Sequence, residues 1–159
     1  MAAIVVKTGA NRTFDVYLSD YTAGTDTPGA VAPAAADRML HGKSISYPEI
    51  SKDDIDTTDW DSTAKEYETG MADYGECQLT QNLNSTELET ALDLAQAETN
   101  KALTIVIKDK SGTVISKRQG FCVVKGVTVN NTEVDGVLEV QSTYKMSGAL
   151  AKLTATLPA

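Results

Sequence analysis

The side chains that most often carry out catalysis are few in this chain and form no known motif. His41 is the only histidine, and it lies between Arg38 and Gly42 rather than beside a nucleophile. A Ser–His–Asp or Cys–His arrangement depends on such a base. The nucleophile elbow, the phosphate-binding loop and the dinucleotide fingerprint are also missing from the sequence. We therefore predict that the protein is not an enzyme, with no catalytic residue and no cofactor.

The two cysteines, Cys77 and Cys122, are separated by 45 positions, and no second pair accompanies them. Structural zinc sites normally use two closely spaced pairs of ligands, so a zinc site is not expected. The first residues lack the charged start and apolar middle of a signal peptide, which favours folding in a reducing cytoplasm. We expect both thiols to be unbridged and buried as small apolar groups.

A long acidic segment, residues 53–76, holds nine carboxylates and one lysine. Its net charge of −8 equals that of the whole 159-residue chain. If Asp54 is placed at the first position of an EF-hand loop, Asp59 falls where glycine is needed and Lys65 where glutamate is needed. The segment is therefore not an EF-hand. A looser cation site and a carboxylate pair for glycoside hydrolysis stay open, but a solvated acidic loop is the simpler interpretation.

The basic residues are concentrated elsewhere in the chain. Residues 101–125 hold six lysines and arginines against Asp109 alone, a net charge of +5. Opposite charges on separate segments allow copies of a small domain to bind head to tail as rings or filaments. The alternative is that folding brings the two segments together within one subunit. The negative total also argues against general affinity for phosphate backbones.

The elements that must position these residues are mainly strands. Alternating apolar and polar side chains predict strands at residues 4–7, 13–19, 39–50, 76–83, 103–108, 113–118, 121–129 and 136–146. The dipeptide Gly120-Phe121 is expected to interrupt this pattern as a bulge or a tight crossing.

One helix is predicted, at residues 86–96, where Leu88, Ala91, Leu92 and Ala95 form a narrow apolar stripe. Thr86 and Glu89 have the spacing of a capping box. Strands without β-α-β alternation, with one helix to cover a sheet face, predict a single mainly β domain over residues 1–159. We expect a β-sandwich or barrel-like fold with one lateral α-helix and long loops.

Two segments have no obvious place in such a core. Residues 21–37 are rich in alanine and contain two prolines and two glycines, so they form either an interaction loop or a plain insertion. Residues 149–159 form a C-terminal arm of mostly small residues.

The order of elements from Ser44 onward resembles the major tail tube protein of long-tailed (siphovirus-type) bacteriophages. The features that carry the resemblance are the acidic segment that closes on Gly70 and Gly75, the strand after it, the capped helix, the Ser-Gly-Thr-Val hairpin at residues 111–114, and the last strand ending at Gly148. Residues 21–37 and 149–159 lie outside the resemblance.

This resemblance implies a tail-tube fold and a structural virion protein. Subunits would form hexameric rings that stack into a tube with an acidic lumen, through which the genome is delivered. The implied partners are other copies, the tape-measure protein, and tail-tip, baseplate and tail-terminator proteins. DNA would pass through without specific binding, because like charge keeps a polyanion from the wall. No membrane is involved, and the protein is expected in the virion tail after synthesis in the host cytoplasm.

The resemblance also indicates which residues act. Residues 53–75 match the family's inter-ring loop, and the candidate ring-stacking residues are Asp53, Asp54, Asp56, Asp59, Trp60, Asp61, Tyr67 and Tyr74. The polar face of the last strand supplies the candidate lumen-facing residues, which are Glu139, Gln141, Thr143 and Lys145.

Two other interpretations stay open. A soluble β-sandwich binding module would use Trp60 with Tyr67 or Tyr74 as a platform for a carbohydrate or a receptor. The tube of a contractile tail or of a secretion apparatus would share the fold and differ by a surrounding sheath.

Overall fold

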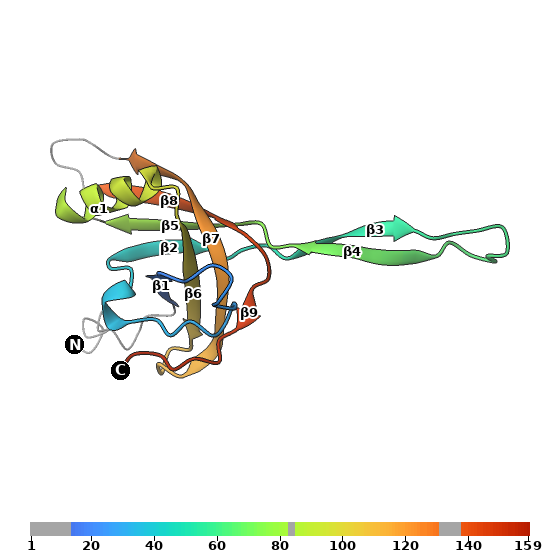
Figure 1. The fold of residues 1–159 in the computed structure, drawn as a ribbon, viewed down its shortest axis with the longest axis horizontal. Helices are drawn as coiled ribbons and strands as arrows, with labels where there is room; N and C mark the ends of the chain where they lie inside the picture. Colours follow the sequence, from blue (N-terminus) through green and yellow to red (C-terminus); the bar gives the residue numbers. More distant parts are fainter. Residues whose placement is uncertain (1–13, 83–84, 131–137) are drawn as a thin grey trace, which may run out of the picture.

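The structure is a computed structural model that describes residues 14–82, 85–130 and 138–159. Within these ranges the chain forms nine strands, one α-helix (α1, Ser85–Gln96) and a short 3₁₀ helix (Ala35–Asp37). The predicted mainly β fold with one helix is confirmed. Figure 1 shows a rounded body, from which one long two-stranded arm projects. No helix in the described ranges has the length and apolar character needed to cross a membrane.

Seven strands of the body form one sheet, in which every pair of neighbouring strands is antiparallel. Along the hydrogen-bonded path the strands are β1 (Phe14–Ser19), β6 (Asn100–Lys108), β7 (Val114–Asn130), β8 (Glu139–Met146), β5 (Glu76–Asn82) and β2 (Gly42–Ser46). The short strand β9 (Ala151–Lys152) pairs with β7 off this path.

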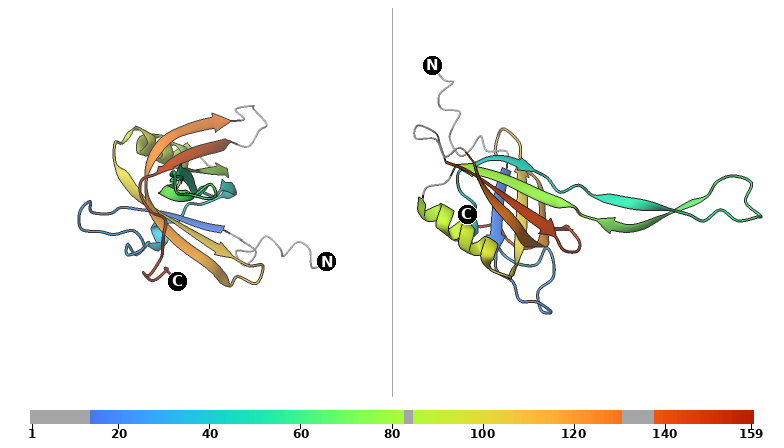
Figure 2. Two further views of the ribbon diagram at one scale, coloured as in Figure 1. Left: turned by 90° about the vertical axis from the view of Figure 1, so that its right-hand side faces the viewer. Right: turned by 90° about the horizontal axis from the view of Figure 1, so that it is seen from above.

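The long strand β7 joins the two halves of this sheet. Its residues 114–123 pair with β6, and its residues 122–130 pair with β8. The register with β8 shifts between Val124 and Gly126, and an irregularity of this kind bends and twists a strand. The sheet therefore curls over itself into a barrel-like sandwich with β1 and β2 as its edges, as Figure 2 shows from two sides.

The core fills the inside of this curl. Alternate strand residues point inward, and the buried core cluster consists of Val16, Cys77, Leu79, Leu103, Ile105, Cys122, Val124, Tyr144, Met146 and Leu150. Both cysteines are buried and unbridged, as expected, and burial raises the pKa of each thiol to about 12. Helix α1 packs against β7, and its Leu94 and Ala95 contact the core.

Helix α1 begins at Ser85, one residue before the predicted start, so Thr86 lies inside the helix rather than at its cap. Gly120 does not interrupt β7, because it pairs in register with Leu103. The tight crossing expected there is confirmed, since a Cβ on Gly120 would lie 2.4 Å from Cε of Met146. The strand predicted at residues 4–7 lies outside the described residues.

The loop at residues 21–37 covers the second face of β1, β6 and β7. The side chain of Gln119 on β7 is fully buried, and its Oε1 accepts hydrogen bonds from the N–H groups of Gly29 (2.9 Å) and Val31 (3.1 Å). Its Nε2 donates to the Val31 carbonyl at 2.8 Å. β1 is buried on both faces. Val16 belongs to the core cluster, and Asp15 and Tyr17 are buried on the opposite face of the strand.

The C-terminal residues 149–159 also return to the body. The Leu153 N–H donates to the Lys117 carbonyl at 3.0 Å, and the Thr154 N–H donates to the Gly29 carbonyl at 2.9 Å. Leu150 and Leu153 are buried. The loop and the C-terminal residues therefore hold each other on the same face of the sheet.

The acidic segment is a regular β-hairpin, where the sequence suggested an irregular loop. Strands β3 (Ser51–Asp56) and β4 (Tyr67–Asp73) pair antiparallel in a sheet of their own and form the arm in Figure 1. The register shifts once, between Lys52 and Asp54. Backbone pairing rather than apolar burial makes this hairpin regular, because every residue of β3 is exposed. Residues 51–73 form this arm.

Candidate functional site

The tip of the arm is a turn with a defined hydrogen-bonding pattern. The Ser62 N–H donates to the Asp59 carbonyl at 3.2 Å and closes a four-residue turn in which Trp60 is the second residue. The Asp59 carboxylate accepts hydrogen bonds from the Asp61 N–H (2.9 Å) and the Ser62 hydroxyl (3.0 Å). Aspartate favours the first position of such turns. The turn therefore presents Trp60 at the tip, where its side chain is fully exposed.

A second set of bonds fixes the tip to the strands. The Thr57 N–H donates to the Glu66 carbonyl at 2.9 Å, and the Glu66 N–H donates to Oγ1 of Thr58 at 3.0 Å. Hydrogen bonds from the Thr58 side chain and N–H hold the pKa of Asp56 below its ordinary value. These hydrogen bonds within the chain hold the tip in a defined conformation.

The arm exposes apolar side chains in addition to its acids. Ile50 at its base and Ile55, Trp60, Tyr67 and Met71 along it are five of the ten large apolar side chains exposed in the described residues. An isolated two-stranded hairpin is marginally stable in water, and clustered exposed apolar groups mark interaction surfaces. The arm has the character of a segment that another protein surface covers.

The arm also carries most of the charge of the protein. Residues 51–73 contain eight carboxylates and two lysines, so the arm has a net charge of −6 out of −8 for the chain. The only ion pairs found for the arm's carboxylates in the described residues are Lys65–Asp56 at 3.9 Å and Lys145–Asp73 at 3.6 Å. The rest of the molecule is therefore close to neutral.

Among the ion pairs of the described residues, none joins the arm to the basic segment 101–125 within one subunit. Three lysines of the basic segment 101–125 form described ion pairs, and Lys101 and Lys108 pair with Asp20 and Asp15 of the body. In the part of the chain that the structure describes, only the Lys125–Glu76 ion pair, at 2.5 Å, joins the acidic segment 53–76 to the basic segment, and Glu76 lies outside the arm. The intramolecular alternative raised by the charge pattern is therefore not the arrangement in this structure.

A second candidate surface is the outward face of β2, β5 and β8. In β8 the residues Val140, Ser142, Tyr144 and Met146 are buried, so the alternate residues face outward. The four candidate lumen residues Glu139, Gln141, Thr143 and Lys145 are those outward residues. They pair across the sheet with Asn82, Thr80, Gln78 and Glu76 of β5, which makes a continuous polar surface.

The charges on this polar face are compensated. Glu139 pairs with Lys43, Glu76 pairs with Lys125, and Lys145 pairs with Asp73 at the base of the arm. Between these pairs Gln141 donates to the side-chain carbonyl of Gln78 at 3.0 Å. The face is polar and nearly neutral, and the acidity of the protein lies on the arm.

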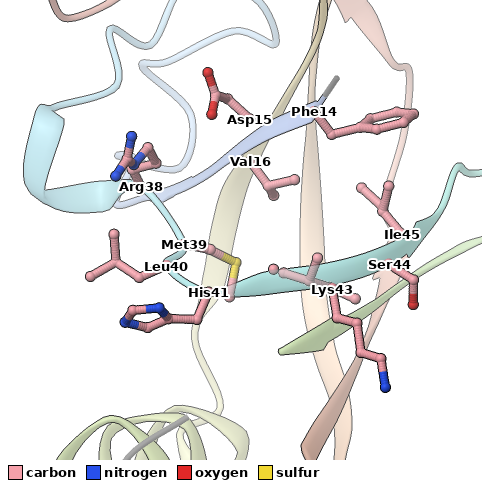
Figure 3. A pocket seen from close by; sticks show the side chains of 12 residues that line it. Phe14, Asp15, Val16, Arg38, Met39, Leu40, His41, Lys43, Ser44 and Ile45 are labelled. Carbon is pink, nitrogen blue, oxygen red and sulfur yellow. The ribbon is translucent and has the colours of Figure 1, made fainter. Parts of the chain in front are cut away.

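A cleft of about 530 Å³ opens between β1 and β2, the two edge strands of the main sheet (Figure 3). Residues 38–41 cross from one edge to the other, and the Met39 N–H donates to the Val16 carbonyl at 2.8 Å. The apolar lining consists of Phe14, Val16, Met39, Leu40, Ile45 and Leu79. In Figure 3 Arg38, Leu40 and His41 gather at one end of the cleft, and Phe14 and Ile45 lie at the other.

The structure separates some residues that the sequence grouped. Trp60 is at the tip and Tyr67 begins β4, whereas Tyr74 lies at the base of the arm, partly buried against the core. Trp60 and Tyr74 therefore form no shared aromatic platform. His41 is exposed, with a positive φ of 56° and its Nε2 3.6 Å from a Glu87 oxygen. Among the described residues no group of three or more His, Cys, Asp or Glu side chains could hold a metal ion.

Sequence reasoning identified Trp60 and Tyr67 of the arm, but it missed Ile55, Met71 and the whole cleft. Ile55 stands between Asp54 and Asp56, and Met71 stands between Gly70 and Ala72, and neither pattern distinguishes an exposed hairpin from a loop. The cleft joins residues from two edge strands whose proximity depends on the curl of the sheet.

Comparison with known proteins supports the fold independently. No protein-family model and no curated protein matches the sequence. The structure is similar to that of the SPP1 tail tube, with a TM-score of 0.61 and 10% identity over 94% of this chain and 80% of the other. A chain of the PVC sheath–tube complex, from an extracellular contractile injection system, gives a TM-score of 0.63 and 15% identity over 97% and 98% of the two chains.

A further similar chain comes from the baseplate of the anti-feeding prophage, with a TM-score of 0.52 and 10% identity over 90% and 95% of the two chains. At these identities the likeness concerns the fold. The chain has the fold of tail tube proteins, as predicted from the order of its elements. That fold is found both in the SPP1 tail tube and in contractile injection systems.

Proposed function

We propose that this protein is the tube subunit of a phage tail, a structural virion protein that assembles as stacked hexameric rings around a bore through which the genome is delivered. The observation that carries the proposal is the arm. It projects from the body, is regular and preorganised, and exposes four large apolar side chains, with Ile50 exposed at its base. Such a segment reaches a stable environment when it lies against a neighbouring subunit.

The arm acts as the contact between rings. Its strands rise about 3.3 Å per residue, so the nine steps from Ser51 to Trp60 span about 30 Å. A body of this size has a radius of gyration of about 14 Å, and the arm therefore reaches across most of a neighbouring subunit. The ring-stacking residues are those on the arm, Asp53, Asp54, Asp56, Asp59, Trp60, Asp61 and Tyr67, with Tyr74 at its base.

The outward polar face of β2, β5 and β8 lines the bore. Its residues Glu139, Gln141, Thr143 and Lys145 are hydrophilic, and its charged groups are paired with opposite charges. A wall of this kind offers no cluster of cations to a passing polyanion. Any acidic character of the lumen then comes from the arms that reach it rather than from this face.

The assembled tube contacts the partners that the tail-tube resemblance implies. These are the tape-measure protein inside the bore, and tail-tip, baseplate and terminator proteins at the ends of the tube. The protein acts in the virion tail. The near-complete mutual coverage with the PVC chain favours one second candidate, the tube of a contractile tail or injection system. Copurification of the tube with a sheath protein from the native particle distinguishes the two.

The test compares the full chain with a variant in which residues 52–72 are replaced by a two-residue Asn-Gly turn. We expect the full chain to form tubes at high concentration in negative-stain electron microscopy, and the variant to stay folded and form no tubes. Thermal unfolding of the variant is the control, and it should match the wild-type body, because no arm residue belongs to the core cluster. Tubes from the armless variant contradict the role of the arm, and a wild-type chain that stays monomeric at every concentration contradicts the function.

A further inference from the structure

The proposed inter-ring contact leaves one question, which is where the tip of the arm is received. Trp60 is the largest side chain in the chain and is fully exposed. The cleft between β1 and β2 is open in the described chain. We propose that the β1–β2 cleft receives the Trp60 side chain of a second copy of this chain. This inference rests on the proposed function and adds the acceptor site to it.

The cleft has the size and the lining for an indole ring. The cleft has a volume of about 530 Å³, which leaves room for an indole ring. A tryptophan in such a contact buries roughly 150–250 Å² of surface. Leu40 and Phe14 stand partly exposed at its opposite ends, and Met39 lies between them. The flexible thioether of methionine adapts to an inserted aromatic ring. Buried tryptophans in pockets are the usual anchors of protein–protein contacts.

The charges around the two partners are complementary. Asp59 and Asp61 flank Trp60 on an arm with a net charge of −6. The cleft lining contains Arg38 and Lys43, and its single carboxylate, Asp15, already pairs with Lys108 at 2.5 Å. Lys43 itself contacts Glu139, so Arg38 is the cation best placed for the incoming carboxylates. A hydrogen bond between a guanidinium and a carboxylate is among the stronger polar contacts.

The direction of the chain also fits a head-to-tail contact. Strand β2 starts beside residues 38–41 and ends at Ser46, and the chain then leads into the arm. The arm and the Arg38–His41 end of the cleft therefore lie at opposite ends of β2. A copy that sits ahead of the arm presents its cleft end to the incoming tip. The contact is heterologous, and repeating it builds an open stack rather than a closed pair.

The first experiment is cross-linking in assembled tubes. Asp61→Cys beside the retained Trp60 is combined with Leu40→Cys at the cleft, and mild oxidation should give a ladder of disulfide-linked multimers on a non-reducing gel. The matched control combines Asp61→Cys with Ile115→Cys, which is exposed on β7 outside the cleft. Cys77 and Cys122 are buried and do not interfere. Tubes without a ladder, or equal ladders in both pairs, overturn the inference.

The second experiment separates donor from acceptor. Trp60→Ala removes the anchor, and Leu40→Arg blocks the cleft, so each variant alone should need a protein concentration higher by about 30-fold or more to form tubes. Mixing rings of the two variants should give pairs of stacked rings and no tubes, because intact tips meet intact clefts at one interface only. Trp60→Phe should restore part of the assembly. Met71→Ala, at another fully exposed apolar residue of the arm, is the control and should change assembly less.

The outcomes distinguish this inference from the proposed function. If wild-type and Trp60→Ala chains form tubes at the same concentration, the cleft is not the acceptor, although the tube function stands. If removal of residues 2–12 abolishes tubes while Trp60→Ala does not, the occupant of the cleft is the N-terminal segment. If the wild-type chain forms no tubes, the proposed function itself fails.

Discussion

The side chain of Gln119 and the backbone of Gly29 meet across 90 residues of sequence, where Oε1 of the buried glutamine accepts the glycine N–H at 2.9 Å. The same amide group also bonds the Val31 N–H, the Val31 carbonyl and the Thr104 hydroxyl. One side chain therefore fastens the loop at residues 21–37 to the sheet.

Replacing this side chain should loosen the loop and destabilise the body. We expect Gln119→Leu to lower the free energy of unfolding by about 2–4 kcal/mol, because it leaves buried N–H groups without an acceptor. Urea unfolding followed by circular dichroism measures the change. Gln141→Leu is the control, since its bond to Gln78 is on the exposed polar face, and it should change the stability by less than about 1 kcal/mol. Equal losses in the two variants would show that Gln119 has no special role.

Alanine substitutions at two glycines of the same loop should distinguish the cost of backbone strain from the cost of a steric clash. Gly24 (φ 81°) and Gly29 (φ 90°) both adopt the left-handed region, but a Cβ on Gly24 meets nothing within 4 Å. A Cβ on Gly29 would lie 2.4 Å from the backbone carbonyl oxygen of Lys152. We expect Gly24→Ala to cost about 1 kcal/mol and Gly29→Ala about 3 kcal/mol or more, measured by thermal unfolding. The larger loss should vanish when residues 151–159 are removed, since the conflicting carbonyl is then gone.

The buried cysteines should make the body less stable at alkaline pH. Burial raises the pKa of Cys77 and Cys122 to about 12 in the folded state, whereas an unfolded thiol ionises near 8.5. Their contribution to stability is therefore complete below about pH 8.5 and is lost as the pH rises toward 12. Urea unfolding at pH 7, 9 and 10 measures the loss.

The double variant Cys77→Ala, Cys122→Ala provides the comparison for this alkaline effect. It should show a smaller fall in stability between pH 7 and pH 10 than the wild-type chain. A thiol reagent should modify the wild-type cysteines only as fast as the body unfolds. Rapid modification of the folded protein at pH 8 is incompatible with this burial.

The turn between β6 and β7 should show the opposite pH dependence. Asp109 accepts hydrogen bonds from the Ser111 hydroxyl (2.6 Å) and from the N–H groups of Thr113 and Ser111 (both 2.9 Å), and these bonds lower its pKa. Its contribution to stability is present above the unfolded value of about 3.9 and is lost as the pH falls through the lower folded pKa. An NMR titration of the carboxyl carbon measures that pKa.

Ser111→Ala should move the pKa of Asp109 back toward its ordinary value. It removes the Ser111 hydroxyl hydrogen bond, which lowers that pKa more than any other contact does. Lys110→Ala in the same turn is the control, and the Asp109 pKa should change less. A titration of Asp109 at or above the ordinary value in the wild-type chain would show that the turn is not held in this way.

Much of the body of the fold follows from the sequence because strands such as β8 have one face on the core. In β8 the buried Val140, Tyr144 and Met146 alternate with outward polar residues, and the predicted strand and its polar face are both confirmed. The helix is predictable for the same reason, because a stripe of apolar residues identifies its buried side.

The arm was predictable in place but not in form. Its strands lack a buried face, so no period of two appears in the hydrophobic pattern. The regular pairing depends on backbone hydrogen bonds and on the Asp59–Ser62 turn. The turn itself could be predicted locally, because aspartate and serine favour such turns. The role of Gln119 and the presence of the cleft could not be predicted, because both depend on contacts between segments far apart in the chain.

The arm leaves the body at one end of β2 only, and this asymmetry has a consequence for any polymer that it builds. A filament formed through such contacts is polar: one terminus displays uncovered hairpins and the other displays vacant acceptor surfaces. The two termini are chemically unlike, so a single capping protein cannot close both. Growth and termination at each end then require distinct factors, and the direction of the filament is already encoded in the shape of one subunit.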